Sequence, residues 1–312
     1  MRIFVTGASG WIGSAVVPEL IGAGHQVVGL ARSDASAAAL EAAGAEVQAG
    51  TLDDLAVLAK AASGADGVIH LAFKHELSFS GDYEGAAAAD RAAVETFADA
   101  MAGTGRPFVL ASGLIGLTPG RAATEEDGHG DDWQAAHAAP GPSARRATAE
   151  MALSLAARGV RSSVMRLPPT VHGDGDNGFM AILVGIARST GVSGYLGDGS
   201  NRWPATHRSD VARLFRLAVE QAPGGSTLHA VAEEGVPIRG VAESIGRQLG
   251  LPVVAITETE AADHFSFLAT FLGLDSPASS TVTRRLLDWQ PTGPGLVEDL
   301  DQGHYLRAPS AG

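Results

Sequence analysis

Residues 5–13 read VTGASGWIG and place Gly7, Gly10 and Gly13 between an apolar run (2–7) and a helical stretch (13–24). In a turn of this kind the first glycine permits a tight bend, and the second lets the backbone approach a pyrophosphate. The third allows close packing of the helix on the strand, and the helix N-terminus supplies amide donors to the phosphates. The stretch therefore predicts a dinucleotide-binding turn at the first strand–helix junction.

The same alternation continues along the chain and predicts an α/β fold. β-Branched runs occur at 26–32, 67–73, 107–113 and 160–166, with helical stretches at 13–24, 90–105 and 143–158. Such alternation implies parallel strands joined by right-handed crossovers. We expect a Rossmann-type doubly wound parallel sheet from residues 1–168, completed by about 207–232. Residues 169–206 and 233–312 would form a smaller C-terminal substrate-binding lobe, with helices at 179–191 and 239–250, and a helix at 210–222 would belong to the sheet domain.

Composition excludes several classes of function. The chain has 312 residues, a formal net charge of −13 and no cysteine. The acidity argues against nucleic-acid binding, and no apolar run approaches the length of a membrane span. The absence of cysteine excludes thiolate chemistry, and the histidines show no metal-ligand spacing. We expect a cytoplasmic protein, monomeric or homodimeric, without metal, nucleic-acid or membrane partners.

Several motifs resemble one family. The Gly-x-x-Gly-x-x-Gly spacing opened by Thr6 is similar to the short-chain dehydrogenase/reductase superfamily, in its extended branch with the epimerases and dehydratases. The stretches GTLDD (50–54, with Asp53), HLA (70–72), RLPPTVHG (166–173) and HRSDVARL (207–214) match further elements of that branch. The resemblance implies a nicotinamide cofactor, bound by Thr6, Gly7, Ser9, Gly10, Trp11, Ile12, Gly13, Arg32, Ser33, Thr51, Leu52, Leu71, Ala72, Lys74, Ala111, Arg146, Pro168, Thr170 and Val171.

The end of the second strand indicates which cofactor is used. An enzyme that prefers NAD keeps an acidic residue there for the ribose 2′-hydroxyl. This chain has LARSD (30–34), in which Arg32 can pair with a 2′-phosphate and Ser33 can add a hydroxyl donor. The sequence therefore predicts NADPH. The alternative is that Arg32 is a surface charge and Asp34 contacts the ribose.

The catalytic motif of the family is altered. Relatives carry Tyr-x-x-x-Lys on the helix expected at 143–158, where the tyrosine donates a proton to the carbonyl oxygen. Here Pro142 falls on the tyrosine position and Arg146 on the lysine position. Proline has no proton to give, and arginine stays protonated near neutral pH. The remaining tyrosines, 83, 195 and 305, are all expected away from this helix, so the conventional mechanism is absent.

Other groups could supply the proton. Ser112, at the end of the strand at 107–113, is the candidate catalytic residue, although a shift of one residue would put Ala111 there instead. Water or an acidic group on the substrate are alternatives. Lys74, His75 and His172 could also reach the cleft, or could be structural. Residues 118–142 are expected to form a lid beside the site, or a solvated acidic insertion.

These observations favour an NADPH-dependent ketoreductase acting on a bulky aromatic ketone. The chain resembles the actinobacterial ketoreductases of antibiotic biosynthesis that tailor aromatic polyketides, of the simocyclinone type, which implies a phenolic ketone as substrate. Two alternatives are a non-catalytic NADPH-binding sensor and an enzyme similar to the nucleotide-sugar epimerases and dehydratases, whose chemistry needs the missing tyrosine. The candidate substrate contacts are His75, His172, Phe179, Met180, Tyr195 and Trp203.

Overall fold

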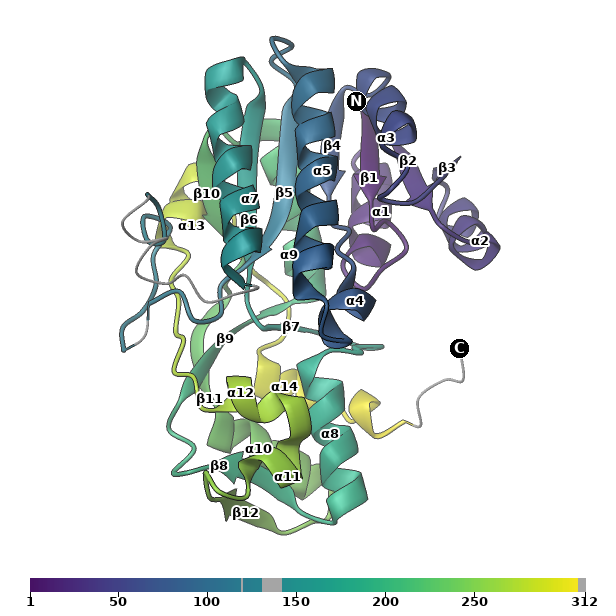
Figure 1. The fold of residues 1–312 in the computed structure, drawn as a ribbon. Coiled ribbons are helices and arrows are strands. Elements are labelled where there is room, and N and C mark those ends of the chain that lie inside the picture. The colour runs from purple at the N-terminus through teal and green to yellow at the C-terminus, as the bar shows by residue number, and fades with distance from the viewer. Residues whose placement is uncertain (119, 131–141, 308–312) are drawn as a thin grey trace.

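A computed structural model describes residues 1–118, 120–130 and 142–307 (Figure 1). Its centre is a seven-stranded sheet in the order β10-β6-β5-β4-β1-β2-β3, and all neighbouring strands in it are parallel. The predicted doubly wound α/β class is confirmed. The strands are β1 (Arg2–Thr6), β2 (Gln26–Ala31), β3 (Glu46–Ala49), β4 (Gly67–His70), β5 (Pro107–Gly113), β6 (Arg161–Leu167) and β10 (Ser226–His229).

Helices cover both faces of this sheet. On one face α1 (Gly13–Gly22) packs beside α9 (Arg208–Gln221), and α2 (Asp34–Ala42) lies near β3. On the other face α3 (Leu55–Ser63), α5 (Tyr83–Met101) and α7 (Pro142–Ser154) lie side by side, with short α4 (His75–Phe79) against α5. The short 3₁₀ helix η1 (Leu155–Arg158) follows α7. The helix expected at 90–105 begins earlier, at Tyr83, because the Ala-rich run before residue 90 is part of the same helix.

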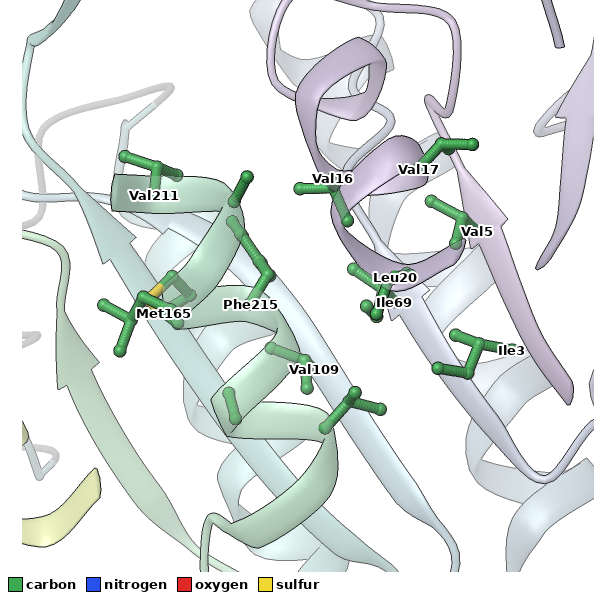
Figure 2. Close-up of a cluster of buried hydrophobic side chains, with 14 of the residues drawn as sticks. Ile3, Val5, Val16, Val17, Leu20, Ile69, Val109, Met165, Val211 and Phe215 are labelled. Atoms are coloured by element: carbon green, nitrogen blue, oxygen red, sulfur yellow. The ribbon is translucent and has the colours of Figure 1, made fainter. Parts of the chain in front are cut away.

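Strand residues alternate between these two layers. Ile3 and Val5 join the cluster beneath α1 and α9, whereas Phe4 joins the cluster beneath α3, α5 and α7. Both faces are covered, and the strands are accordingly apolar along almost their whole length. Figure 2 shows the first cluster, in which Val16 and Phe215 approach the sheet from the two helices.

A smaller lobe lies beyond one end of the sheet (Figure 1). It contains a three-stranded sheet in the order β11-β9-β7 and the parallel pair β12-β8, around its own apolar core. Its strands are β7 (Thr170–His172), β8 (Ser193–Leu196), β9 (Arg202–His207), β11 (Glu233–Pro237) and β12 (Val253–Ile256). The later helices are α8 (Phe179–Thr190), α10 (Ile238–Leu249), α11 (Ala261–Phe265), η2 (Ser266–Leu268), α12 (Ala269–Leu272), α13 (Thr281–Leu287), α14 (Leu296–Asp301) and η3 (His304–Leu306), and α13 packs on β10.

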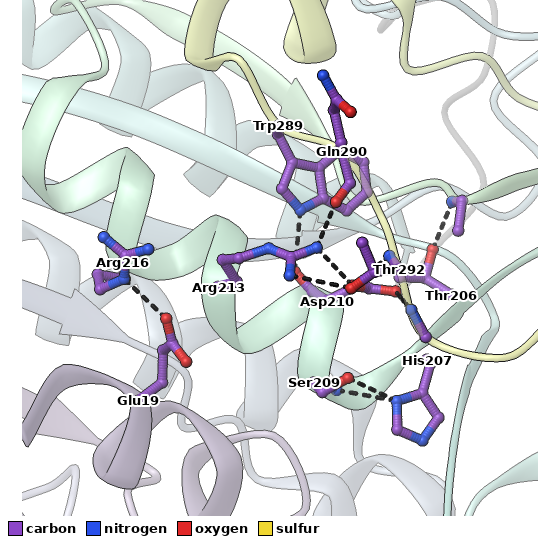
Figure 3. Close-up of polar contacts among 12 residues, drawn as sticks. Glu19, Thr206, His207, Ser209, Asp210, Arg213, Arg216, Trp289, Gln290 and Thr292 are labelled. Atoms are coloured by element: carbon purple, nitrogen blue, oxygen red, sulfur yellow. Dashed lines mark hydrogen bonds and ion pairs between the residues drawn. The ribbon is translucent and has the colours of Figure 1, made fainter. Parts of the chain in front are cut away.

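Asp210, in the HRSDVARL stretch, anchors the C-terminal segment to α9 (Figure 3). Its buried carboxylate accepts the backbone N–H groups of Thr292 at 2.9 Å and Gly293 at 2.8 Å. The Arg213 guanidinium donates to the same carboxylate at 2.7 Å, and the indole of Trp289 donates to the Asp210 carbonyl at 3.1 Å. A buried carboxylate needs such compensation, so the role that the structure gives Asp210 is structural.

Gly13 should be essential for the contact between α1 and β1. A Cβ atom at this position would lie 2.2 Å from the Gly7 carbonyl oxygen and 2.6 Å from the Ala8 carbonyl carbon, both rigid backbone atoms. We expect Gly13→Ala to lower the free energy of unfolding by about 1–3 kcal/mol, as overpacking does elsewhere. Urea denaturation measures it.

Gly22, at the other end of α1, is the matched control. A Cβ there would meet no described atom within 4 Å. Gly22→Ala should therefore be neutral or stabilising, by up to about 1 kcal/mol through helix propensity. Equal destabilisation by the two substitutions would contradict the packing argument.

Candidate active site

The glycine turn has the shape that a diphosphate requires. Gly7 has φ +65°, and a Cβ there would lie 2.8 Å from the Ala72 nitrogen. Gly10 differs, because it is exposed and, among described atoms, its Cβ would approach the Gly7 oxygen alone, at 3.2 Å. The protein leaves this side of Gly10 open, directly before the ten-residue helix α1 with its positive N-terminal end. Exposed Ser9 and half-buried Ile12 flank the opening. A dinucleotide pyrophosphate fits the cradle.

Trp11 fastens this turn to the second lobe. Its indole N–H donates to the carbonyl oxygen of Val171 at 2.9 Å, and the guanidinium of Arg208 lies 4.3 Å from the ring centroid. Thr170 and Pro168, both buried, lie on the same short segment after β6. The structure thus brings together predicted cofactor contacts that are about 160 positions apart in the chain.

Two ion pairs join the segments that follow β2, β3 and β4. Arg32, just after β2, pairs with Glu76 of α4 at 2.7 Å, and Lys74 pairs with Asp53 at 2.7 Å. The Arg32 guanidinium holds the pKa of Glu76 below its ordinary value by hydrogen bonding and charge. Glu76 was not anticipated from the sequence, since nothing in the local pattern pairs α4 with β2.

Neighbours of Arg32 and Asp53 in the chain have structural partners of their own. Ser33 caps α2 by accepting the N–H of Ser36 at 3.2 Å. Thr51 donates its N–H and hydroxyl to Asp54, at 2.7 and 2.9 Å, and Leu52 is buried. The Ser33 hydroxyl also donates to the Ser36 hydroxyl at 3.1 Å, so a 2′-phosphate would have to take its proton from that contact.

Ser112 faces the helix layer that contains α7. Phe108 and Leu110 belong to the cluster beneath α5 and α7, whereas Val109 and Ala111 belong to the opposite cluster. Strand side chains alternate, so Ser112 shares the face of Leu110, and Ala111 points to the other. Arg146 of α7 donates to the carbonyl oxygen of Ile115 at 3.2 Å, which holds α7 against the segment after β5.

A buried polar chain lies beneath the turn. The Ala72 N–H donates to Thr6 Oγ1 at 3.3 Å, and that oxygen lies 2.5 Å from His70 Nδ1. If the Thr6 hydroxyl donates its proton to Nδ1, the proton of the neutral ring is on Nε2. That nitrogen lies 3.3 Å from Asp90 Oδ1 on α5. Leu71 and Ala72 therefore follow β4 in a fixed position beside Gly7.

The expectation that no tyrosine lies near α7 is wrong. Tyr83 is the first residue of α5, and its ring centroid lies 5.9 Å from that of Phe73. The guanidinium of Arg145 lies 4.2 Å from the same Phe73 ring. Burial raises the pKa of Tyr83, and the charges of Arg145 and Arg146 oppose that rise. An Asp before a helical run is a common N-cap, so Asp82 could have located the start of α5, but not its approach to α7.

The predicted substrate contacts do not gather in one place. Met180 and Trp203 are 1% and 0% exposed and belong to the core of the lobe, so the expectation that their side chains line a pocket is corrected. Their large apolar surfaces pack there instead. Phe179 lies between Trp203 and Phe271, each centroid at 5.6 Å, and Tyr195 is on β8, at the far end of the lobe in Figure 1.

The two candidate histidines also separate. His172 is fully buried and its Nδ1 lies 2.9 Å from Asp299 Oδ2, so it joins β7 to α14 rather than facing the cleft. His75 is exposed, with its ring 5.1 Å from that of Phe73, and so it lies near the end of β4 as expected.

The described part of the predicted lid packs on the protein. Buried Glu125 accepts the N–H and hydroxyl of Thr283 on α13, both at 2.7 Å, and Ala123 pairs with Ala278. His129 lies 2.7 Å from Glu150 of α7, an ion pair that raises the pKa of the imidazole. Residues 119 and 131–141 lie outside the described residues, and a covering role for them stays a prediction.

No helix within the described ranges has both the length and the apolar character needed to cross a membrane. Nor do residues 1–118, 120–130 and 142–307 contain a cluster of three or more His, Asp or Glu side chains arranged to hold a metal ion.

Comparison with known proteins identifies the family. Residues 3–230 match the model of the NAD dependent epimerase/dehydratase family, and the chain belongs to that family. A protein of Schizosaccharomyces pombe is 45% identical over 98% of this chain and its own full length, and one of Saccharomyces cerevisiae is 42% identical with the same coverage; both are uncharacterized. A 2-alkyl-3-oxoalkanoate reductase of Stenotrophomonas maltophilia is 28% identical over 81% of this chain and 77% of its own. By class the chain is a nicotinamide-dependent oxidoreductase.

Solved structures agree with this fold. UDP-glucose 4-epimerase of Thermotoga maritima superposes with a TM-score of 0.76 at 19% identity, over 98% of each chain. MoeE5 in complex with UDP-glucose and NAD superposes with a TM-score of 0.75 at 22% identity, also over 98% of each chain. At these identities the likeness concerns the fold, which is the predicted one.

Gly10→Val should abolish cofactor binding without unfolding the protein. The branched side chain would fill the open side of the turn, where the pyrophosphate has to approach the backbone. Fluorescence titration with reduced nicotinamide dinucleotides should show no saturable binding, while the circular dichroism spectrum and melting temperature stay near the parental values. Parental affinity in this variant would refute the cradle.

Proposed function

We propose that the chain is an NADPH-dependent ketoreductase that works without the Tyr-x-x-x-Lys pair of its family. The observation that carries the proposal is that three features lie at or beside the carboxyl ends of β1 and β5. These are the open cradle at Gly10, the α7-facing Ser112 and the α7 residue Arg146. The relative that is a 2-alkyl-3-oxoalkanoate reductase supports a carbonyl as the group acted on.

Cofactor choice rests on Arg32. Its side chain is 67% exposed at the end of β2, where an enzyme specific for NAD keeps a carboxylate. A guanidinium binds a 2′-phosphate through paired, charge-assisted hydrogen bonds. In this structure the Arg32 guanidinium is paired with the Glu76 carboxylate, and a 2′-phosphate would have to replace that carboxylate. Lys74, paired with Asp53 nearby, adds a second positive charge to the same end.

The chain's residues then have separate roles in the reduction. When bound, the reduced nicotinamide supplies the hydride that converts the carbonyl carbon into a carbinol carbon. Arg146 holds ribose hydroxyls from α7, because its guanidinium can donate hydrogen bonds but stays protonated near neutral pH. Ser112 donates a hydrogen bond to the carbonyl oxygen and polarises it. Both groups orient the reactants, and holding them in near-attack geometry is itself a large contribution to the rate.

A bulky aromatic ketone, as in polyketide tailoring, remains the proposed substrate. The core positions of Met180 and Trp203 remove two of its expected walls, while Phe73 and His75 beside the end of β4 supply aromatic surface instead. The 3-oxo acid that the name of the bacterial reductase implies is the second substrate class to test. Cytoplasmic location and a monomeric or homodimeric state belong to the same proposal.

A matched pair of variants tests the cofactor assignment. Arg32→Asp should weaken NADPH binding roughly tenfold to a hundredfold, the range of a lost charge-assisted contact, and improve relative affinity for NADH. Glu76→Gln should strengthen NADPH binding, because the carboxylate that competes with the 2′-phosphate is gone. Dissociation constants for both cofactors, measured by titration, check both changes. If neither variant alters the NADPH to NADH preference, Arg32 does not contact the 2′-phosphate.

A substrate panel tests the reaction itself. Purified protein with NADPH should oxidise the cofactor in the presence of phenolic aromatic ketones, and 2-alkyl-3-oxo acids are the comparison set. Absorbance at the reduced-nicotinamide band follows the reaction, and a titration without substrate measures cofactor binding separately. Tight binding with no turnover on any ketone would instead favour the non-catalytic sensor.

A further inference from the structure

We propose that Tyr83 donates the proton in this reduction, from α5 rather than from α7. The inference rests on the proposed reductase function. It starts from the packing of α5 on α7, in which the half-buried Tyr83 and the guanidinium of Arg145 contact the same Phe73 ring. Arg146, next to Arg145, is at the family's lysine position, and Pro142 is at its tyrosine position. The phenol and its cationic neighbour are thus both present, although they come from two different helices.

The place of Tyr83 is well fixed. It begins α5, and Asp82 caps this helix by accepting the Gly85 N–H at 2.9 Å. The Tyr83 ring packs on Phe73, which follows β4 beside Leu71 and Ala72. Figure 1 shows the first turn of α5 next to α4, at the end of the sheet that faces the second lobe. Substrates of open α/β sheets bind at this end of the strands.

Charges around the phenol suit an acid. Burial raises the pKa of Tyr83, the charges of Arg145 and Arg146 lower it, and Asp90 further along α5 raises it. The net direction is upward, so the phenol keeps its proton at neutral pH. When the proton leaves, the two guanidiniums of α7 stabilise the phenolate. His75 of α4 is a further titratable group here, because its ring packs on Phe73, which also contacts Tyr83.

Tyr83 loses one proton, and the carbonyl oxygen gains it. The O–H bond of Tyr83 breaks as an O–H bond forms at the carbonyl oxygen, while the carbonyl carbon accepts the hydride named above. The products are the alcohol, the oxidised cofactor and a phenolate at Tyr83 Oη. Solvent then returns one proton to Oη, which the half-exposed position of the ring permits.

Other groups on the chain are less suited to the step. A serine hydroxyl such as Ser112 is a much weaker acid than a phenol and polarises the carbonyl without giving up its proton. The Tyr305 hydroxyl donates to Asp176 at 2.8 Å, and burial, together with the charge of Asp176, raises the pKa of Tyr305 far above its usual range. Tyr195, on β8, has the guanidinium of Arg239 from α10 over its ring, 5.5 Å from the ring centroid.

Tyr83→Phe tests the proposal while keeping the ring that packs on Phe73. Single-turnover oxidation of bound NADPH by a ketone that the parent reduces should slow by about 10²–10⁴-fold, the usual contribution of a general acid. The dissociation constant for NADPH should stay within about twofold, since the hydroxyl is assigned to the substrate. Glu84→Gln, an exposed neighbour in the same helical turn, is the control and should leave the rate unchanged.

A second measurement needs neither cofactor nor substrate. The chain has three tyrosines, so protein labelled at the tyrosine ring carbon that bears oxygen gives three NMR signals, and Tyr83→Phe assigns one of them. Arg146→Met removes a nearby cation and should delay ionisation of Tyr83, lowering its ionised fraction at pH 11. Arg158→Met, which breaks an exposed pair with Asp99 at 2.9 Å, should leave that fraction unchanged.

The outcomes are distinguishable. A parental single-turnover rate in Tyr83→Phe would overturn the proposal while leaving the ketoreductase intact. A parent that reduces no ketone would overturn the proposed function, and the NMR titration would still decide whether Tyr83 adjoins Arg146. A Tyr83 signal indifferent to Arg146→Met would overturn the placement on which the proposal depends. Loss of the rate with retained binding, together with the delayed titration, would support it.

Discussion

The contact between Thr6 Oγ1 and His70 Nδ1, 2.5 Å long and completely buried, holds together the parts of the molecule on which function depends. Thr6 ends β1 before the glycine turn, and His70 ends β4. Through Nε2 the same imidazole reaches Asp90 of α5 at 3.3 Å. Buried polar groups that lose their partner cost about 1–3 kcal/mol each. The His70 side chain thus contacts both the turn and α5, in addition to the β1–β4 ladder and the apolar packing of α5 on the sheet.

That constraint has consequences at both ends of the cleft. On the cofactor side it seats Ala72 against Gly7, so closely that glycine is required there. On the substrate side it fixes α5, and with it the position of Tyr83 above Phe73. Trp11 connects the second lobe to the glycine turn, because its indole N–H donates a hydrogen bond to the Val171 carbonyl oxygen. The glycine cradle and the proposed proton donor are thus parts of one connected structure.

Two positions of α7 depart from the family motif, and their effects are related. Pro142 removes the phenol from α7, while Arg146 keeps a permanent cation at the lysine position. A cation there is useful to any phenol that approaches it, whichever helix carries that phenol. Glu76 shows the same kind of long-range pairing at the other end, because the partner of Arg32 comes from a helix about 44 residues away. The groups at this site thus come together from different helices and strands of the fold.

Local pattern was enough for the α/β class, for five strands of the central sheet, for six of the helices and for the glycine turn. Apolar runs, helical stretches and the spacing of Gly7, Gly10 and Gly13 are short-range properties, and they determine where the chain turns and which faces are buried. Packing decided the rest. Trp203 and Met180 were expected to line the substrate pocket. Apolar side chains suit a core as well as a pocket, and only the tertiary structure shows that these two belong to the core. The neighbours of Arg32 and Arg146 were likewise out of reach, since Glu76 and Tyr83 come near them only when α4 and α5 pack against the sheet.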